Sequence, residues 1–206
     1  FENTCVGRSS LIALTTGDSN VAVGSYALTV NTTGGSNTAV GKSAMAANTT
    51  GAENIAIGLS AMSNNTTASS NIAIGSSALA ANTTGHSIVA IGAAALSAHN
   101  VTNGGGSQDV AIGTNAMATS TSASGSTAIG AQALKTISTG ERNTAIGAHA
   151  LELSSGSTSD NTALGYYALE ATTTGASNTA VGANAMALNT TGEANVAVGF
   201  QALDAA

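Results

Sequence analysis

Short apolar boxes recur along the whole chain, separated by turns rich in Asn, Thr, Ser and Gly. The segment NTTGGSNTAVG at 31–41 returns as NTTGAENIAIG at 48–58 and as NTTGEANVAVG at 189–199. The box has β-branched residues on either side of an alanine, a composition typical of a short strand. The chain is therefore an array of one repeated unit, and its fold is set by that repetition.

The repeat has a fixed length. Nine of the eleven intervals between the glycines that close the boxes equal the interval from Gly24 to Gly41, which is seventeen positions. The closing glycines are Gly7, Gly24, Gly41, Gly58, Gly75, Gly92, Gly113, Gly130, Gly147, Gly165, Gly182 and Gly199. The two longer intervals run from Gly92 to Gly113 and from Gly147 to Gly165, and they contain the turn-rich segments 101–108 and 154–160. We expect both to be insertions into outward loops.

A unit of this length predicts an all-β fold, a parallel β-solenoid (β-roll) of about twelve coils. Seventeen residues are too few to fold alone and too few for a strand followed by a full helix. Coils stacked about 4.8 Å apart would make a rod roughly 55 to 60 Å long. We expect residues 1–206 to form this single solenoid, without a capping element at either end.

Each position of the unit has an expected role. The closing glycine should supply a positive φ, and the Asn before each box should take a left-handed turn and bond to its copy in the next coil. The A-[L/M]-x-x stretch is interpreted as a second short strand or a bend, with one helical turn as the alternative. Its large apolar residue should fill the core. This core row is Leu28, Met45, Met62, Leu79, Leu96, Met117, Leu134, Leu151, Leu169, Met186 and Leu203.

The alanine at the centre of each box forms a second row. Its members are Ala22, Ala39, Ala56, Ala73, Ala90, Ala111, Ala128, Ala145, Ala163, Ala180 and Ala197, with Cys5 in the same position of the first box. Since both faces of the box are apolar or small, this row either lies where two walls of one coil approach, or packs against another chain. We favour lateral self-association through the row. Cys5 is expected to be a buried free thiol, with a bond between chains as the alternative.

Composition and charge exclude several classes of function. Charged residues make up 7% of the chain and the net charge is −6, so no basic stripe is available for nucleic acid. No run of 18 apolar residues predicts a membrane span. His86, His99 and His149 occupy different positions of the repeat without metal-ligand spacing. A rod of like groups predicts no enzyme, no cofactor and no metal site.

A ladder of threonine pairs is the strongest signal for a different function. Its first members include Thr32, Thr49, Thr66, Thr83, Thr173 and Thr190. Ranked threonines suggest an ice-binding solenoid, but adjacent residues of a strand face opposite sides, so the T-T spacing does not form a plane of two columns. The other interpretation is a turn ladder held by hydroxyl-to-backbone bonds. The N-x-T sequons at Asn31, Asn48, Asn64, Asn65, Asn82, Asn100 and Asn189 repeat with the same turn.

The boxes NVAVG, NIAIG and NTAIG, followed by a small residue and Ala, resemble the head repeats of trimeric autotransporter adhesins and the repeats of phage and bacterial tail fibres. The resemblance implies a left-handed parallel β-roll, three chains side by side, and a role as a surface fibre. We therefore expect a noncatalytic extracellular fibre or adhesin shaft. Its expected partners are copies of itself, as a lateral homotrimer or an end-to-end filament, with a cell-surface or glycan receptor bound by other parts of the protein.

Overall fold

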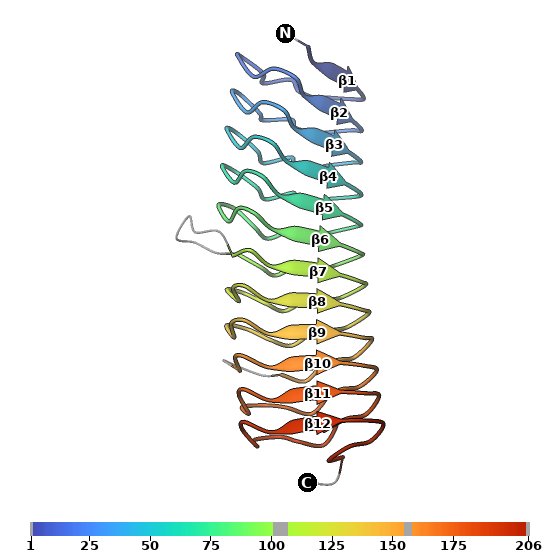
Figure 1. Ribbon diagram of the computed structural model, residues 1–206. Coiled ribbons are helices and arrows are strands. Elements are labelled where there is room, and N and C mark those ends of the chain that lie inside the picture. Colours follow the sequence, from blue (N-terminus) through green and yellow to red (C-terminus); the bar gives the residue numbers. More distant parts are fainter. Residues whose placement is uncertain (1, 101–106, 155–157, 205–206) are drawn as a thin grey trace.

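Short parallel strands stack one above another along a single axis (Figure 1). A computed structural model describes residues 2–100, 107–154 and 158–204. One twelve-stranded sheet runs through these residues, with its strands in sequence order. The strands are β1 (Thr4–Val6), β2 (Val21–Val23), β3 (Thr38–Val40), β4 (Ile55–Ile57), β5 (Ile72–Ile74), β6 (Val89–Ile91), β7 (Val110–Ile112), β8 (Thr127–Ile129), β9 (Thr144–Ile146), β10 (Thr162–Leu164), β11 (Thr179–Val181) and β12 (Val196–Val198). The predicted parallel β-solenoid is confirmed.

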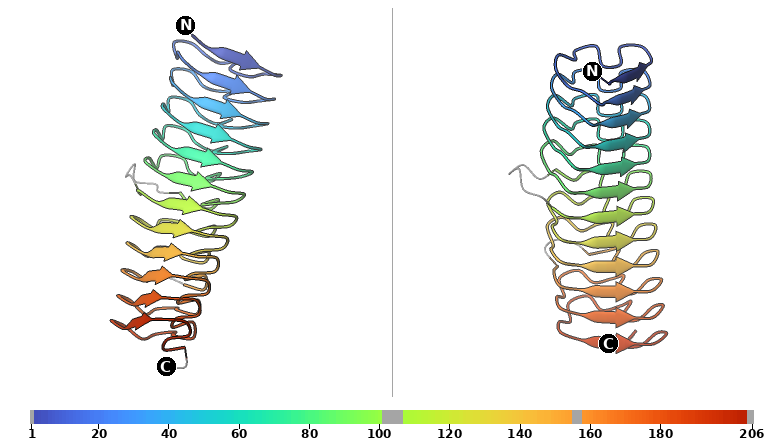
Figure 2. Two further views of the ribbon diagram at one scale, coloured as in Figure 1. Left: turned by 45° about the vertical axis from the view of Figure 1, so that its right-hand side comes forward. Right: turned by 45° about the horizontal axis from the view of Figure 1, so that its top comes forward.

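The strands pair in one unbroken register. Ala39 of β3 lies opposite Ala56 of β4, and the same alanine position pairs at every step of the sheet. The two long intervals do not shift this register, because Ala90 pairs with Ala111 and Ala145 pairs with Ala163. All strands point the same way in both views of Figure 2. Residues 101–106 and 155–157 lie outside the described residues, so the expected outward insertions there stay predictions, as does the handedness of the coil.

The core lies inside the coils, and the A-[L/M]-x-x stretch contributes two apolar residues to it in each turn of the solenoid. The predicted core row is buried from Leu28 to Met186, where at most 1% of any side chain is exposed. The alanine before each of these residues is buried beside it, from Ala27 to Ala185. Leu203 is the exception: it is 48% exposed because it belongs to the last coil of the described chain, on which no further coil packs.

The alanine row of the boxes also faces the interior. Its members from Ala22 to Ala180 have no exposed surface, and Ala197 is 3% exposed. The assignment of this row to an interface between chains is therefore wrong. The first alternative holds, because the box and the opposite wall of the same coil are close enough to enclose a methyl group. Cys5 is exposed in β1 and not buried as expected, since no coil of the described residues lies beyond it.

The A-[L/M]-x-x stretch forms turns, and the described residues contain no helix and no second strand there. The expected bend is present and the expected strand is wrong. The core residues themselves adopt a left-handed conformation, with φ of 49° at Leu28 and 50° at Met45. Each of them donates its backbone N–H to the next coil: Leu28 bonds to the Ala44 carbonyl at 3.1 Å and Met45 to the Ala61 carbonyl at 3.0 Å. These bonds offset the unfavourable backbone angle.

The glycine that closes each box is required by its own copies in the stack. Gly75 has a φ of 135°, and a Cβ built on it would lie 2.4 Å from the carbonyl oxygen of Gly92. Both the backbone angle and the space therefore exclude a side chain. The prediction of positive φ at this position is confirmed, and the glycine column lets successive coils approach within hydrogen-bonding distance.

Buried asparagines form the predicted ladder. The Oδ1 atom of Asn20 accepts the backbone N–H of Asn37 at 3.0 Å and its side-chain amide at 3.2 Å, and that amide also donates to the Gly51 carbonyl at 2.8 Å. The asparagine was expected to adopt the left-handed conformation, but the residue before it does so instead. Ser36, for example, has a φ of 57°. The Asn is thus free to use its side chain, while its neighbour makes the turn.

A second asparagine ladder, which the sequence did not indicate, runs through the NTTG turns. The Asn48 amide donates to Oδ1 of Asn31 at 2.9 Å and to the Gly51 carbonyl at 3.0 Å. Asn31, Asn48, Asn65 and Asn82 have no exposed surface. The sequons at these four positions are therefore inaccessible in the folded rod, whereas the Asn64 sequon is exposed.

Candidate functional site

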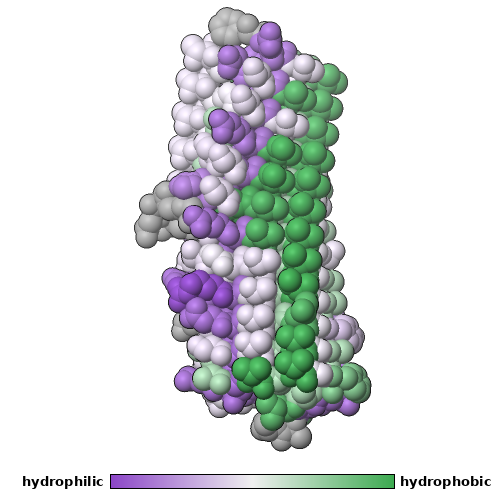
Figure 3. Space-filling view, in the orientation of Figure 1, coloured by the Kyte–Doolittle hydropathy of each residue, from purple (hydrophilic) through white to green (hydrophobic). Residues whose placement is uncertain are grey.

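The outer sheet face is the most extensive candidate surface. On each strand from β2 to β12 the residues on either side of the buried alanine point outward, and Figure 3 shows them as columns running along the rod. The first column is Val21, Thr38, Ile55, Ile72, Val89, Val110, Thr127, Thr144, Thr162, Thr179 and Val196, and the second is Val23, Val40, Ile57, Ile74, Ile91, Ile112, Ile129, Ile146, Leu164, Val181 and Val198. Neither column contains a charged residue.

The outer sheet face is largely apolar, and its side chains are half-buried in most strands and exposed in the others. Ile55 and Ile57 of β4 are each 38% exposed, and Leu164 of β10 is 45% exposed. With about 4.8 Å between strands and about 3.3 Å per residue, the face measures on the order of 50 Å by 10 Å, or about 500 Å². A patch of that size lies within the range of about 300 to 600 Å² that the largest apolar patch of a soluble monomer covers, and such patches are often functional.

The threonine ladder is held to the backbone of the neighbouring coil. The Thr32 hydroxyl donates to the Thr49 carbonyl, Thr49 to Thr66, Thr66 to Thr83 and Thr173 to Thr190, each at 3.0 Å. The Thr83 hydroxyl donates to Oδ1 of Asn100 at 2.8 Å. The interpretation as a turn ladder is confirmed for these residues. Because the hydroxyl protons are already used, the ladder does not favour ice binding.

A histidine and an aspartate are buried together where both asparagine ladders are interrupted. His99 occupies an Asn position of the second ladder and Asp109 one of the first. Neither has exposed surface, and Nε2 of His99 lies 3.8 Å from Oδ2 of Asp109. These two atoms have no hydrogen-bond partner in the described residues. The pair is enclosed in the core, so we regard it as a structural irregularity and not as a site open to substrate.

Burial shifts the pKa values of both residues of this pair in the direction that favours the neutral form. It raises the pKa of the Asp109 carboxyl from 3.8 to about 7, although the backbone N–H of Ser126 donates to Oδ1 at 2.8 Å. It lowers the pKa of the His99 imidazole from 6.5 to about 4. Desolvation in the interior disfavours the charged form of an acid and of a base alike. Both groups are therefore neutral between these two values.

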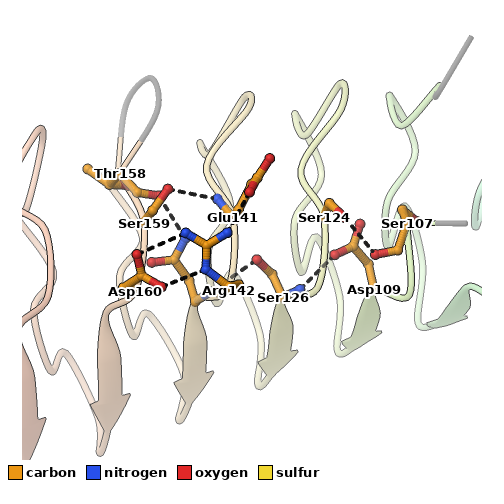
Figure 4. Close-up of polar contacts among 10 residues, drawn as sticks. Ser107, Asp109, Ser124, Ser126, Glu141, Arg142, Thr158, Ser159 and Asp160 are labelled. Atoms are coloured by element: carbon orange, nitrogen blue, oxygen red, sulfur yellow. Dashed lines mark hydrogen bonds and ion pairs between the residues drawn. The ribbon is translucent and has the colours of Figure 1, made fainter. Parts of the chain in front are cut away.

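An exposed ion-pair cluster joins the coils of β9 and β10. The guanidinium of Arg142 points toward Asp160, with Nε 2.7 Å from Oδ1 and Nη2 3.0 Å from Oδ2, and its Nη1 lies 2.6 Å from Oε2 of Glu141 (Figure 4). The hydrogen bonds with Arg142 hold the pKa of Asp160 below its usual value. The pair is bidentate, and it links these two coils.

Aromatic and charged side chains gather on the turns after β8, β9 and β10. The imidazole of His149 stacks on the ring of Tyr167, with centroids 4.7 Å apart, and the Tyr166 ring meets Tyr167 edge-on at 4.2 Å. Glu152 accepts from Nδ1 of His149 at 2.6 Å and from Nζ of Lys135 at 3.2 Å. Burial acts to raise the pKa of Glu152, but these hydrogen bonds lower it below its usual value.

This cluster was not found from the sequence. Aromatics make up 2% of the chain, and the adjacent Tyr166 and Tyr167 gave no periodic signal. The signal that was available is the spacing from His149 to Tyr167, which equals the local repeat length from Gly147 to Gly165. Residues one repeat apart lie side by side in a solenoid, so unusual residues at that spacing predict a cluster.

No group of three or more His, Cys, Asp or Glu side chains that could hold a metal ion occurs in residues 2–100, 107–154 and 158–204. Within the same ranges no helix is long and apolar enough to cross a membrane.

Comparison with known proteins does not add a relative to these observations. No family model, no curated protein and no solved structure matches the chain. The function is therefore inferred from the geometry of the rod and of its surfaces, and above all from the outer sheet face.

Proposed function

We propose that the chain is a noncatalytic structural rod, a shaft segment of an extracellular fibre or adhesin, whose copies associate side by side through the outer sheet face. The observation that carries this proposal is the pair of uncharged columns over eleven strands in register. The resemblance of the boxes to adhesin head repeats supports the extracellular location. Receptor binding belongs to other parts of the protein in this proposal.

The interior of the rod supports a mechanical role. Each coil inside the stack pairs its strand with the strands of the coils before and after it, and the asparagine ladders add side-chain bonds between a number of the coils. Stability in such an array is a sum of nearly identical nearest-neighbour terms. The length of the shaft is then set by the number of repeats, and the buried side chains repeat without forming a concave polar site.

A second copy of the chain is the partner that fits the outer sheet face best. Two such faces packed together would bury on the order of 1,000 Å² in total, which reaches the lower bound for a specific protein interface. The face has no charge to exclude an identical face, and β-branched side chains in register can interdigitate with little loss of rotamer entropy. Lateral association follows from these features without any contribution from the alanine row.

The proposal is tested by placing lysines on the outer sheet face. We expect the unaltered chain to sediment as a dimer or trimer, and the double variant Ile57→Lys, Ile74→Lys to sediment as a monomer with an unchanged circular dichroism spectrum and thermal midpoint. The matched control is Leu188→Lys, because Leu188 is 62% exposed but lies off this face. Analytical ultracentrifugation measures the mass.

Two outcomes would contradict the proposal. If the unaltered chain stayed monomeric at its highest soluble concentration, lateral association would be wrong. If that monomer also showed thermal hysteresis, lost on the same lysine substitutions, the outer sheet face would have to be assigned to ice binding.

A further inference from the structure

The Tyr166 patch is a surface cluster that the proposed shaft function does not use. It consists of Tyr166, Tyr167 and Glu170 on the turn after β10, and of His149 and Glu152 on the turn after β9. The two turns are stacked directly, since the N–H of Tyr167 donates to the Ala148 carbonyl at 3.2 Å. The same positions in most other coils carry small residues such as Ser and Ala. The patch is thus a local departure from an otherwise uniform surface.

The rings of the patch form two walls at a right angle. Tyr167 and His149 are nearly parallel, with an interplanar angle of 22°. Tyr166 stands at 68° to Tyr167 and at 89° to His149. Tyr166 is 51% exposed, whereas Tyr167 and His149 are half-buried. Tyr166 therefore offers part of an electron-rich ring to solvent while it contacts a second aromatic ring.

The two carboxylates of the patch differ in how they are satisfied. Glu152 is bound by both His149 and Lys135. Glu170 makes no side-chain hydrogen bond or ion pair within the described residues. Partial burial raises the pKa of Glu170, and the negative charge of Glu152 raises it further. His149 acts in the opposite direction but does not cancel these effects. A positive charge beside Glu170 would relieve this repulsion.

The chain already places a cation over a tyrosine on the corresponding turns of its first two coils. The Arg8 guanidinium carbon lies 5.3 Å from the centroid of the Tyr26 ring, within the range of a cation–π interaction. Arg8 directly follows the closing glycine Gly7, as Tyr166 follows Gly165, whereas Tyr26 lies two positions after Gly24, as Tyr167 does after Gly165. Within the described residues, no lysine or arginine lies over the ring of Tyr166 or of Tyr167.

We propose that the Tyr166 patch binds an organic cation, an ammonium or guanidinium group, which lies against the exposed face of the Tyr166 ring and pairs with the Glu170 carboxylate. The ring supplies the quadrupole attraction and the carboxylate supplies charge and hydrogen-bond acceptors. Since both groups are open to water, a single cation is held with a dissociation constant on the order of millimolar. The net charge of −6 favours such a ligand over an anion.

Tyrosine ring resonances in the NMR spectrum provide the test, because the chain has three tyrosines and Tyr26 serves as an internal reference. The probes are the blocked tripeptides Gly-Arg-Gly and Gly-citrulline-Gly, which differ in charge, and tetramethylammonium, which has no N–H donor. We expect Gly-Arg-Gly to shift the Tyr166 resonances in a saturable manner, at least fivefold more tightly than the citrulline peptide. Binding should weaken as salt is raised.

Variants separate the two parts of the patch. Tyr166→Phe should keep binding within about twofold, whereas Tyr166→Leu should abolish the saturable shift. Glu170→Gln should weaken Gly-Arg-Gly several-fold and tetramethylammonium less, since the latter depends on the ring and not on hydrogen bonds. Equal binding of tetramethylammonium and the arginine peptide would identify a general ammonium site, and preference for the peptide a guanidinium site.

The proposal is overturned if the charged and the citrulline peptides give the same shifts, or if Tyr26 and Tyr166 shift alike and linearly. The result does not depend on lateral association, because the Tyr166 patch lies on the turns and not on the outer sheet face. A monomeric chain that binds the arginine peptide would contradict the shaft proposal alone.

Discussion

At the residue scale, the molecule depends on a few positions whose side chains meet their own copies. Asparagine amides, closing glycines and core Leu or Met residues each form a column in which one position contacts the same position one repeat away. A substitution at such a position therefore alters contacts in its own coil and in the coils on either side. The positions that break a column are the most informative to change, and the buried Asp109 is the clearest of them.

Asp109→Asn is expected to stabilise the rod at neutral pH by about 1–3 kcal/mol, because it replaces a buried acid by the amide that the ladder uses elsewhere. The expected pH dependence follows from the pKa values. The folded Asp109 keeps its proton up to about pH 7 while the unfolded one loses it near 3.8, so its contribution to stability falls over that window. His99, with a folded pKa of about 4 against 6.5, contributes stability that rises between those values.

These two slopes offset each other in the unaltered chain from about pH 4 to 6.5. In Asp109→Asn the His99 slope remains alone, so the thermal midpoint should rise with pH over that window. Thermal unfolding followed by circular dichroism at several pH values measures this. The exposed Asp18→Asn is the control and should leave the profile unchanged. A profile of Asp109→Asn as flat as that of the parent would contradict the assignment.

Gly75→Ala should destabilise the rod by about 3 kcal/mol or more, because the new Cβ meets the Gly92 carbonyl and the backbone has a φ that Ala rarely adopts. Gly125→Ala is the matched control. Gly125 has a φ of 65°, and its nearest contact would be Cγ of Arg142 at 3.8 Å, so only the backbone angle opposes the change. We expect a loss of about 1 kcal/mol there. Equal losses in chemical unfolding would refute the role of the close approach.

At the element scale, one coil is the unit of structure, and it consists of one three-residue strand and a set of turns. The strands alone bury little, since Ala is the only inward residue of each. The turns provide the large core residue and the coil-to-coil bonds from Leu28 and Met45. A coil is therefore stable only when another coil, with its strand and core residues in the same phase, lies beside it.

Deletion of residues 42–58 removes one full period and rejoins Gly41 to a residue that normally follows a closing glycine. We expect this variant to fold cooperatively as a rod shorter by about 4.8 Å. Deletion of residues 43–58 removes one residue fewer and displaces Ala61 and Met62 from their buried positions, which should cost about 3 kcal/mol relative to the first deletion. Denaturant unfolding compares the two. Equal stability would show that the coils do not depend on register.

The strands, their register and the core row could be predicted from the sequence because periodicity alone determines them. The backbone of the turns could not, since nothing in the identity of Leu28 indicates a φ of 49°. The direction of the alanine row was predicted wrongly because both sides of the box are apolar, so alternation did not distinguish inside from outside. The threonine hydroxyl bonds were predicted correctly from the chemistry of the T-T pair.

Contacts between unlike residues on different coils were also beyond the sequence. His99 and Asp109 come together only because the second Asn ladder lies beside the first, which no pattern in the chain indicated. The Tyr166 patch likewise becomes visible only when the coils of β9 and β10 are stacked, because stacking brings His149 against Tyr167. Sequence periodicity predicts which residues repeat, and structure is needed for those that do not.

At the scale of the whole molecule, the rod has surfaces of different character along its length. The outer sheet face is uncharged, the threonine turns are polar and bonded to backbone, and the turns after β8, β9 and β10 carry two of the three tyrosines and several charges. Because every coil is held by its neighbours in the same way, a surface is changed by substituting outward residues while the interior is left intact.

The sheet keeps its pairing at both places where the repeat is longer than elsewhere, as Ala145 with Ala163 and Ala90 with Ala111 demonstrate. The pairing of two successive strands thus does not depend on the number of residues that connect them. Foreign peptides grafted at these two connections would be carried at a fixed height on a rigid support, and several grafts in neighbouring coils would be spaced like rungs. The chain could therefore serve as a rigid support that holds other sequences at regular intervals.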